Sequence, residues 1–278
     1  MTNRRGFTLI ELLVGMVLLS IVGVAMIKVI ATSQRVTTAQ SERVANQGNV
    51  RLSTFVVPAE LTQINSTGTT DIVSMNATTI RYLVPRGMGF LCLANNATTV
   101  SVYANATYTG RLPIVGRGDK IYVFSEGPDV TVSTDDSWIL TGAVTNVQAN
   151  GSCTGGVNTY VFTSTGVPTA NITLGSPVKV MEEMELGSYV SGGQTWLGIR
   201  SVSGGEAALQ PVLGPLKTGG FNLAYEDASG TTTASTTAVR SIVMTIVGLT
   251  DRSVTTSGTA LNRAVVQDSL QTRITLRN

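Results

Sequence analysis

The sequence contains no histidine, and only 13% of its 278 residues are charged. Histidine is the usual general base and the commonest metal ligand in proteins, so its absence disfavours most enzymes and metal centres. Basic residues number 19 and acidic residues 17, and the balance becomes 17 to 17 without the first six residues. This charge excludes the broad basic surface of a strong nucleic-acid binder. We therefore expect no enzymatic activity and no cofactor.

Cysteine is also scarce, since the chain has only Cys92 and Cys153. Two thiols without histidine do not complete a zinc site. In an oxidising compartment they would form one disulfide closing a loop of about 60 residues, which stabilises a fold by about 4 kcal/mol on the chain-entropy model. The alternative is a pair of buried thiols that pack as small apolar side chains.

One long hydrophobic run stands out against this composition. From Phe7 to Ile27 the only charged side chain is that of Glu11. A helix of this length rises about 30 Å, the thickness of the hydrocarbon core of a bilayer. Arg4 and Arg5 precede the run, so the positive-inside rule predicts a cytoplasmic N-terminus and an exported remainder. Because an unpaired carboxylate is unfavourable in hydrocarbon, Glu11 is expected to have a function.

Three ordinary explanations of this run fit less well. A secretory signal peptide has a shorter apolar region and a small-x-small cleavage site, which the stretch VIATS around Ala31 matches poorly. A twin-arginine signal would explain NRRGFTL, but such signals are usually less apolar and carry no acid in the core. A plain one-pass anchor leaves Glu11 unexplained.

The stretch RRGFTLIELLVGMVLLSIV, residues 4–22, resembles the N-terminus of type IV prepilins, a class that includes the pseudopilins of type II secretion. The resemblance implies that a prepilin peptidase cleaves between Gly6 and Phe7 and methylates the new amino group of Phe7. It also implies that the Glu11 carboxylate pairs with the Phe7 amine of a neighbouring subunit. In an apolar filament core such a pair offsets the burial of both charges and favours the correct axial register.

The helix is expected to continue beyond the membrane segment. After Lys28 the sequence turns polar but keeps a loosely helical spacing of apolar residues over 29–56. We predict a helix over 7–64, with 7–27 in the membrane and a kink or end near Pro58.

The rest of the chain, 65–278, is predicted to form a β-rich head that follows a leader peptide at 1–6 and the long helix. Short alternating runs separated by turn residues indicate mostly antiparallel strands, and the fold class is α+β. The expected strands are 71–75, 79–84, 119–126, 158–164, 177–190, 195–202 and 238–250.

The C-terminal third carries a second resemblance. GGFNLAYEDASG, AVRSIVMTIVGLTDR and the ending DSLQTRITLRN resemble PilW-type minor pilins, and J-type minor pseudopilins share this organisation. No resemblance is found for about 67–205. The expected function is that of a minor pilin that primes pilus assembly or lies at the filament tip, with a head that contacts other subunits or serves adhesion or DNA uptake.

The partners implied are other minor and major pilins or pseudopilins, the prepilin peptidase and the inner membrane. The implied location is a single pass through the inner membrane with a periplasmic head, then a filament at the cell surface. Three alternatives remain: a J-type pseudopilin of type II secretion, a membrane-anchored binding protein outside any filament, and a secreted hydrolase.

Two other patterns in the head were considered. The Arg-Gly-Asp tripeptide at 117–119 occurs in some adhesins, but it fits equally well as a turn before a strand. Acidic clusters lack the spacing of a calcium-binding EF-hand loop and are interpreted as solvated turn and strand faces; they are Asp129, Asp135, Asp136, Glu182, Glu183 and Glu185.

Overall fold

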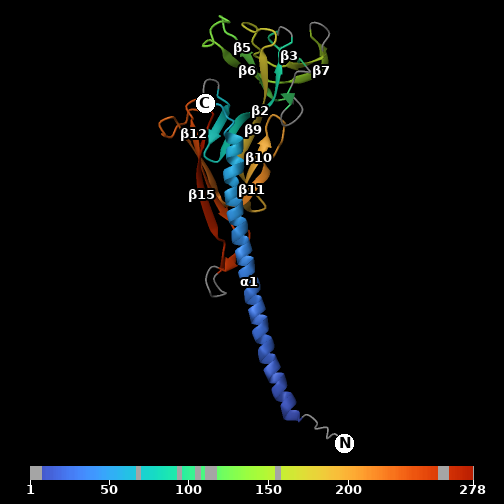
Figure 1. Ribbon diagram of the computed structural model, residues 1–278, viewed down its shortest axis with the longest axis vertical. Helices are drawn as coiled ribbons and strands as arrows, with labels where there is room; N and C mark the ends of the chain where they lie inside the picture. Colours follow the sequence, from blue (N-terminus) through green and yellow to red (C-terminus); the bar gives the residue numbers. More distant parts are fainter. Residues whose placement is uncertain are drawn as a thin grey trace. The chain divides into compact units, whose positions relative to one another are not determined.

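The α+β class is confirmed by a long helix, α1 (Leu9–Leu61), that precedes a mostly antiparallel β head (Figure 1). The computed structural model describes residues 8–66, 70–92, 96–103, 108–109, 118–153, 158–255 and 263–277. Two compact units are formed, one by Met1–Gly48 with Leu249–Asp268 and the other by Asn49–Gly248 with Ser269–Asn278.

Helix α1 continues through Pro58 and ends at Leu61. A proline inside a helix removes one backbone hydrogen bond, and here it stands in the last turn, where little helix remains to be disrupted. The carbonyl of Pro58 still accepts a hydrogen bond from the N–H of Thr62 at 2.9 Å. The helix therefore extends one turn beyond the proline.

The larger sheet of the head follows the order β1-β2-β9-β10-β11-β12-β15, and its strands with described pairing are antiparallel. Three further strands, β4, β5 and β6, pair at its side, with β5 joined to β9. The bounds are β1 (Ile72–Asn76), β2 (Thr79–Phe90), β4 (Tyr108–Thr109), β5 (Lys120–Ser125), β6 (Ser137–Ala143), β9 (Pro177–Ser191), β10 (Gln194–Ser201), β11 (Gln210–Glu226), β12 (Ser241–Leu249) and β15 (Gln267–Thr275).

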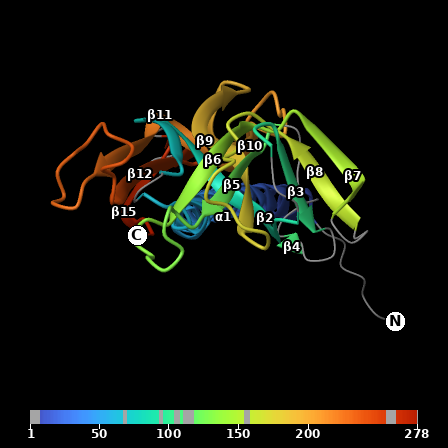
Figure 2. The same cartoon turned by 90° about the horizontal axis from the view of Figure 1, so that it is seen from above.

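A second sheet has the order β3-β8-β7, with β3 (Thr99–Tyr103), β8 (Asn158–Thr163) and β7 (Asn146–Ser152). Within the head, Figure 2 shows it on the opposite side of β9 from β12 and β15. A short hairpin, β13 (Val254–Thr255) with β14 (Arg263–Ala264), extends the connection between β12 and β15.

The main hydrophobic core lies between the end of α1 and the larger sheet. The helix contributes Val50, Val57 and Leu61, and the sheet contributes large side chains such as Tyr82 and Phe221. Burial of each such aliphatic or aromatic side chain stabilises the fold by about 1.5–3 kcal/mol. The last turns of α1 are therefore an integral part of the head.

A second hydrophobic core lies between the β3-β8-β7 sheet and the neighbouring strands β5 and β9. Phe162 of β8, Ile121 of β5 and Val178 of β9 are its buried members from these elements. Strand β9 contributes to both cores, because Val178 belongs to the second and Leu186 to the first. Beside the second core, a disulfide joins Cys92 to Cys153, whose Cα atoms are 5.6 Å apart.

Candidate functional site

The start of α1 is organised by Thr8 and Glu11. One carboxylate oxygen of Glu11, Oε2, accepts hydrogen bonds from the backbone N–H of Thr8 at 2.9 Å and from its hydroxyl at 3.0 Å. The backbone N–H of Glu11 donates in return to the Thr8 hydroxyl at 3.4 Å. This reciprocal pattern is a capping box, which satisfies backbone donors that the first helical turn leaves free.

The capping box leaves part of the Glu11 carboxylate available. Its second oxygen, Oε1, makes no hydrogen bond to the residues that the structure describes. A negative charge near a helix N-terminus is also favoured by the helix dipole. Glu11 is thus an oriented carboxylate with one oxygen open to an incoming cation. The residues expected to be processed or to precede the cleavage, Arg4, Arg5, Gly6 and Phe7, lie outside the described residues.

The apolar part of α1 is exposed among the residues that the structure describes. The helix is long and apolar enough to cross a membrane, and none of its most apolar stretch is buried. In the core helix of a soluble protein the corresponding side chains would pack against other elements. Exposed apolar side chains recur closer to the head, at Val36, Val44, Leu52 and Phe55.

The Arg-Gly-Asp tripeptide is not presented as an adhesive loop. The Asp119 side chain is fully buried; its Oδ2 pairs with Nη1 of Arg86 at 2.8 Å, and its Oδ1 accepts the hydroxyl of Ser203 at 2.6 Å. Gly116 and Arg117 lie outside the described residues. A carboxylate used inside the fold cannot also reach a receptor.

The prediction that the acids of β9 form a solvated face was wrong. Glu182 and Glu183 are 3% and 8% exposed. Glu182 accepts the hydroxyl of Ser201, and Glu183 pairs with Arg81 and Lys120. Buried carboxylates require such partners because desolvation is otherwise unfavourable. These acids therefore join neighbouring strands.

The other acidic cluster is held by local hydrogen bonds. Asp129 accepts both the N–H and the hydroxyl of Thr131, and these bonds lower the pKa of the Asp129 carboxyl. Asp135 accepts the N–H of Asp129 at 3.1 Å. Within the described ranges, no group of three or more His, Cys, Asp or Glu side chains is placed to hold a metal ion.

A further polar contact joins the segment that follows α1 to strand β5. The Asp71 carboxylate accepts the N–H of Asn65 at 2.9 Å and the hydroxyl of Tyr122 at 3.1 Å. Burial raises the pKa of Asp71, although both hydrogen bonds act in the opposite direction. Burial and the nearby Asp71 charge raise the pKa of Tyr122.

Comparison with known families bears on the N-terminal segment alone. The family model described as the prokaryotic N-terminal methylation motif matches residues 1–27. This match supports a prepilin- or pseudopilin-type protein, and together with the uncovered apolar helix it fits membrane anchoring. It ends before the head, so the PilW-type resemblance stays a prediction. No curated protein and no solved structure matched the chain.

Proposed function

We propose that the chain is a minor pilin of a type IV pilus, cleaved between Gly6 and Phe7 and assembled through its N-terminal helix. The observation that carries this proposal is the combination at the start of α1: an exposed apolar segment, with the oriented carboxylate of Glu11 one turn from the cleavage position. The methylation motif matches the same residues.

The proposed assembly step depends on charge pairing. Cleavage gives Phe7 a positive amino group, and the open oxygen of Glu11 accepts the amine of a neighbouring subunit. In a medium of low dielectric constant the pair is strongly favoured over two separate charges. The capping box contributes by fixing the direction of the carboxylate, so less conformational entropy is lost when the pair forms.

The exposed apolar side chains beyond the membrane segment support packing against other helices. Phe55 is 72% exposed and Val44 68% exposed. Large apolar side chains that remain exposed along a helix favour burial against a partner. In a filament, the helices of other pilins would cover them, while the head with its two cores contacts other minor pilins.

The first test is tandem mass spectrometry of the N-terminal peptide from membrane and sheared-filament fractions, with and without the prepilin peptidase. We expect an N-methylated Phe7 terminus that disappears without the peptidase, and recovery in the sheared fraction. An intact Met1 start, or a start near Thr32, would contradict the pilin proposal.

A variant pair tests the role of the carboxylate. Glu11→Ala should accumulate in the membrane but be lost from sheared filaments, whereas Glu42→Ala, the same change further along α1, should assemble normally. Normal assembly of Glu11→Ala would favour a membrane-anchored binding protein. Dependence of the sheared fraction on type II secretion genes would assign the chain to the J-type pseudopilins.

A further inference from the structure

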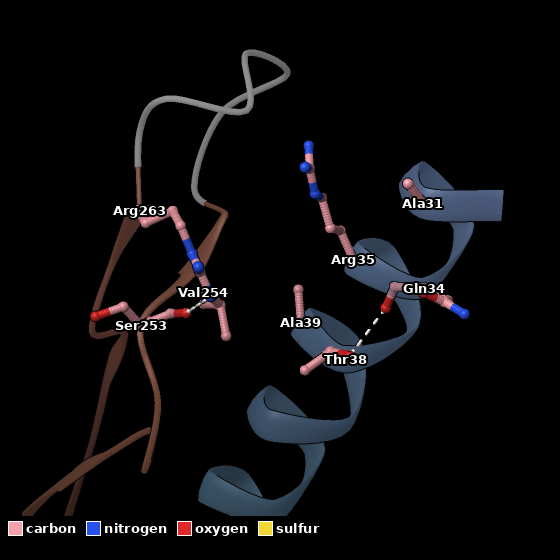
Figure 3. A pocket seen from close by; sticks show the side chains of 8 residues that line it. All are labelled: Ala31, Gln34, Arg35, Thr38, Ala39, Ser253, Val254 and Arg263. Atoms are coloured by element: carbon pink, nitrogen blue, oxygen red, sulfur yellow. Dashed lines mark hydrogen bonds between the residues drawn. The ribbon is translucent and has the colours of Figure 1, made fainter. Parts of the chain in front are cut away.

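A pocket of about 410 Å³ lies beside α1, just beyond its apolar segment (Figure 3). One wall is the helix and the other is the β13–β14 hairpin, and both belong to the same compact unit. The lining residues are Ala31, Gln34, Arg35, Thr38 and Ala39 of the helix and Ser253, Val254 and Arg263 of the hairpin.

The pocket is positively charged. Its lining includes two arginines, Arg35 and Arg263, and no acidic side chain. Arg35 makes no ion pair or hydrogen bond within the described residues, and both arginines are exposed. Arg263 is oriented by its Nη2, which donates to the carbonyl oxygen of Ser253 at 2.8 Å. The guanidinium groups thus remain open to an anion.

The residues of α1 near Arg35 are spaced so that small side chains line the pocket. A further basic residue lies on the same side of the helix, closer to the apolar segment. Ala31 and Ala39 lie four residues before and after Arg35, so small side chains flank the arginine on one stripe of the helix. Lys28 lies seven residues before Arg35 and falls on the same stripe. Lys28, Arg35 and Arg263 are thus three basic side chains along one side of this unit.

The depth of the pocket matches the headgroup layer of a bilayer. If the hydrocarbon core ends near Ile27, Ala31 lies about 6 Å beyond it at the helical rise. Headgroups occupy roughly 5–7 Å on each side of the core. Helix side chains lean toward the N-terminus, and in Figure 3 the Arg35 side chain extends from its own turn toward the end of the helix that carries Ala31. The guanidinium therefore reaches the depth of the lipid phosphates.

We propose that this pocket binds the phosphodiester headgroup of an anionic phospholipid while the subunit is in the membrane. Arginine suits this ligand because its planar fork matches two phosphate oxygens at once. The proposal rests on membrane insertion of 7–27 and is independent of filament assembly. Its consequence is a fixed lipid contact on the head side of the anchor, which orients the helix and hairpin toward the bilayer surface.

The test uses the full chain in nonionic detergent, with native mass spectrometry as the readout of lipid binding. Phosphatidylglycerol and phosphatidylcholine of equal chain length are titrated separately. A basic side chain near an anionic lipid surface contributes the equivalent of about a fivefold change in affinity. We expect a clear preference for phosphatidylglycerol and a loss of about fivefold for each of Arg35→Ala and Arg263→Ala.

Matched controls separate the pocket from general charge. Arg43→Ala removes an exposed charge from the same helix, and Arg252→Ala removes one beside the hairpin; neither residue lines the pocket. Both should change the affinity less than twofold, and Arg35→Lys should retain more binding than Arg35→Ala. Far-UV circular dichroism verifies that each variant is folded.

Several outcomes would overturn the proposal. Equal affinity for the two lipids would show that the pocket does not select an anionic headgroup. Equal losses of lipid affinity in the control variants and in the pocket variants would show that binding depends on general charge rather than on this pocket. Competition by glycerophosphate at the same concentration as the lipid would assign the pocket to a free phosphate. Loss of self-association in Arg35→Ala with unchanged lipid affinity would assign it to a carboxylate of a second copy. None of these results depends on whether the chain enters a filament, which the sheared fraction reports separately.

Discussion

Removal of the Arg86 guanidinium should destabilise the head strongly. Its Nη1 lies 2.8 Å from Asp119 Oδ2, and the two side chains are 10% and 0% exposed. Glu182 Oε1 is 4.0 Å from the same nitrogen. The Arg86→Ala variant would leave two buried carboxylates without this cation. Loss of one partner of a buried pair costs about 3–5 kcal/mol because the other charge stays desolvated.

The assay is urea unfolding of the full chain in nonionic detergent, followed by the fluorescence of Trp138 and Trp196. A matched control is Arg273→Ala, which breaks the pair with Glu226, where the arginine side chain is 60% exposed. Exposed pairs contribute about 0–1 kcal/mol. Arg86→Ala should therefore lower the free energy of unfolding several times more than Arg273→Ala.

A double variant tests the reason for the loss. Arg86→Met with Asp119→Asn removes both charges but keeps an amide oxygen that can accept the hydroxyl of Ser203. Asp119 is the carboxylate closer to Arg86, and Glu182 keeps its hydrogen bond from Ser201 in either variant. If the unpaired Asp119 charge causes the instability, the double variant should recover a large part of the stability lost in Arg86→Ala. Equal losses in Arg86→Ala and Arg273→Ala, or no recovery in the double variant, would refute this reasoning.

Other predictions concern the disulfide, the buried carboxyl and the helix start. Replacement of Cys92 and Cys153 by Ser should lower the free energy of unfolding by about 4 kcal/mol; urea curves that do not differ would contradict this. Because the folded pKa of Asp71 is raised, its contribution is full below the unfolded value of about 3.9 and is lost as the pH rises through the folded value. The unfolding free energy of the protein relative to Asp71→Asn should thus fall as the pH rises above about 4, and a flat difference would count against this assignment. Thr8→Ala removes the cap of Glu11 and should speed amide exchange in the first helical turn by severalfold in detergent, since such caps contribute about 0.5–2 kcal/mol; unchanged exchange would mean that the cap does not hold the turn.

Elements with strong periodicity were predictable from the sequence. The helix predicted over 7–64 is found at Leu9–Leu61, and the strand predicted over 177–190 is β9, Pro177–Ser191. Both carry long runs of side chains typical of their structures, so local preference and burial agree.

The longest strand, β11 (Gln210–Glu226), was not predicted as one strand. It contains Pro211 and Pro215 and several glycines, which normally indicate turns. The strand pairing is irregular at these residues. The register with β10 shifts between Leu213 and Leu216, on either side of Pro215, and the register with β12 shifts between Leu216 and Phe221. Only tertiary contacts, which a local pattern does not contain, can keep such a segment extended.

Among the candidate site residues, too, some were predictable from the sequence and others were not. The assembly role of Glu11 was predicted from its motif and stays a prediction, whereas the Thr-x-x-Glu spacing of the capping box was present in the sequence but was not used. The Arg86–Asp119 pair could not be predicted, because it depends on how β2, β9 and β5 align. The pocket between Arg35 and Arg263 likewise requires knowledge that a late hairpin lies beside an early helix.

The position of β9 in both hydrophobic cores has a consequence for how the head unfolds. Two cores built on separate elements can melt independently, as sub-domains do. Here Val178 and Leu186 lie on one continuous strand, paired with β2 along most of its length. Unfolding of one core would release the half of β9 that packs in it, while the other half of β9 still packs in the other core. We therefore expect the two cores to unfold together rather than one after the other.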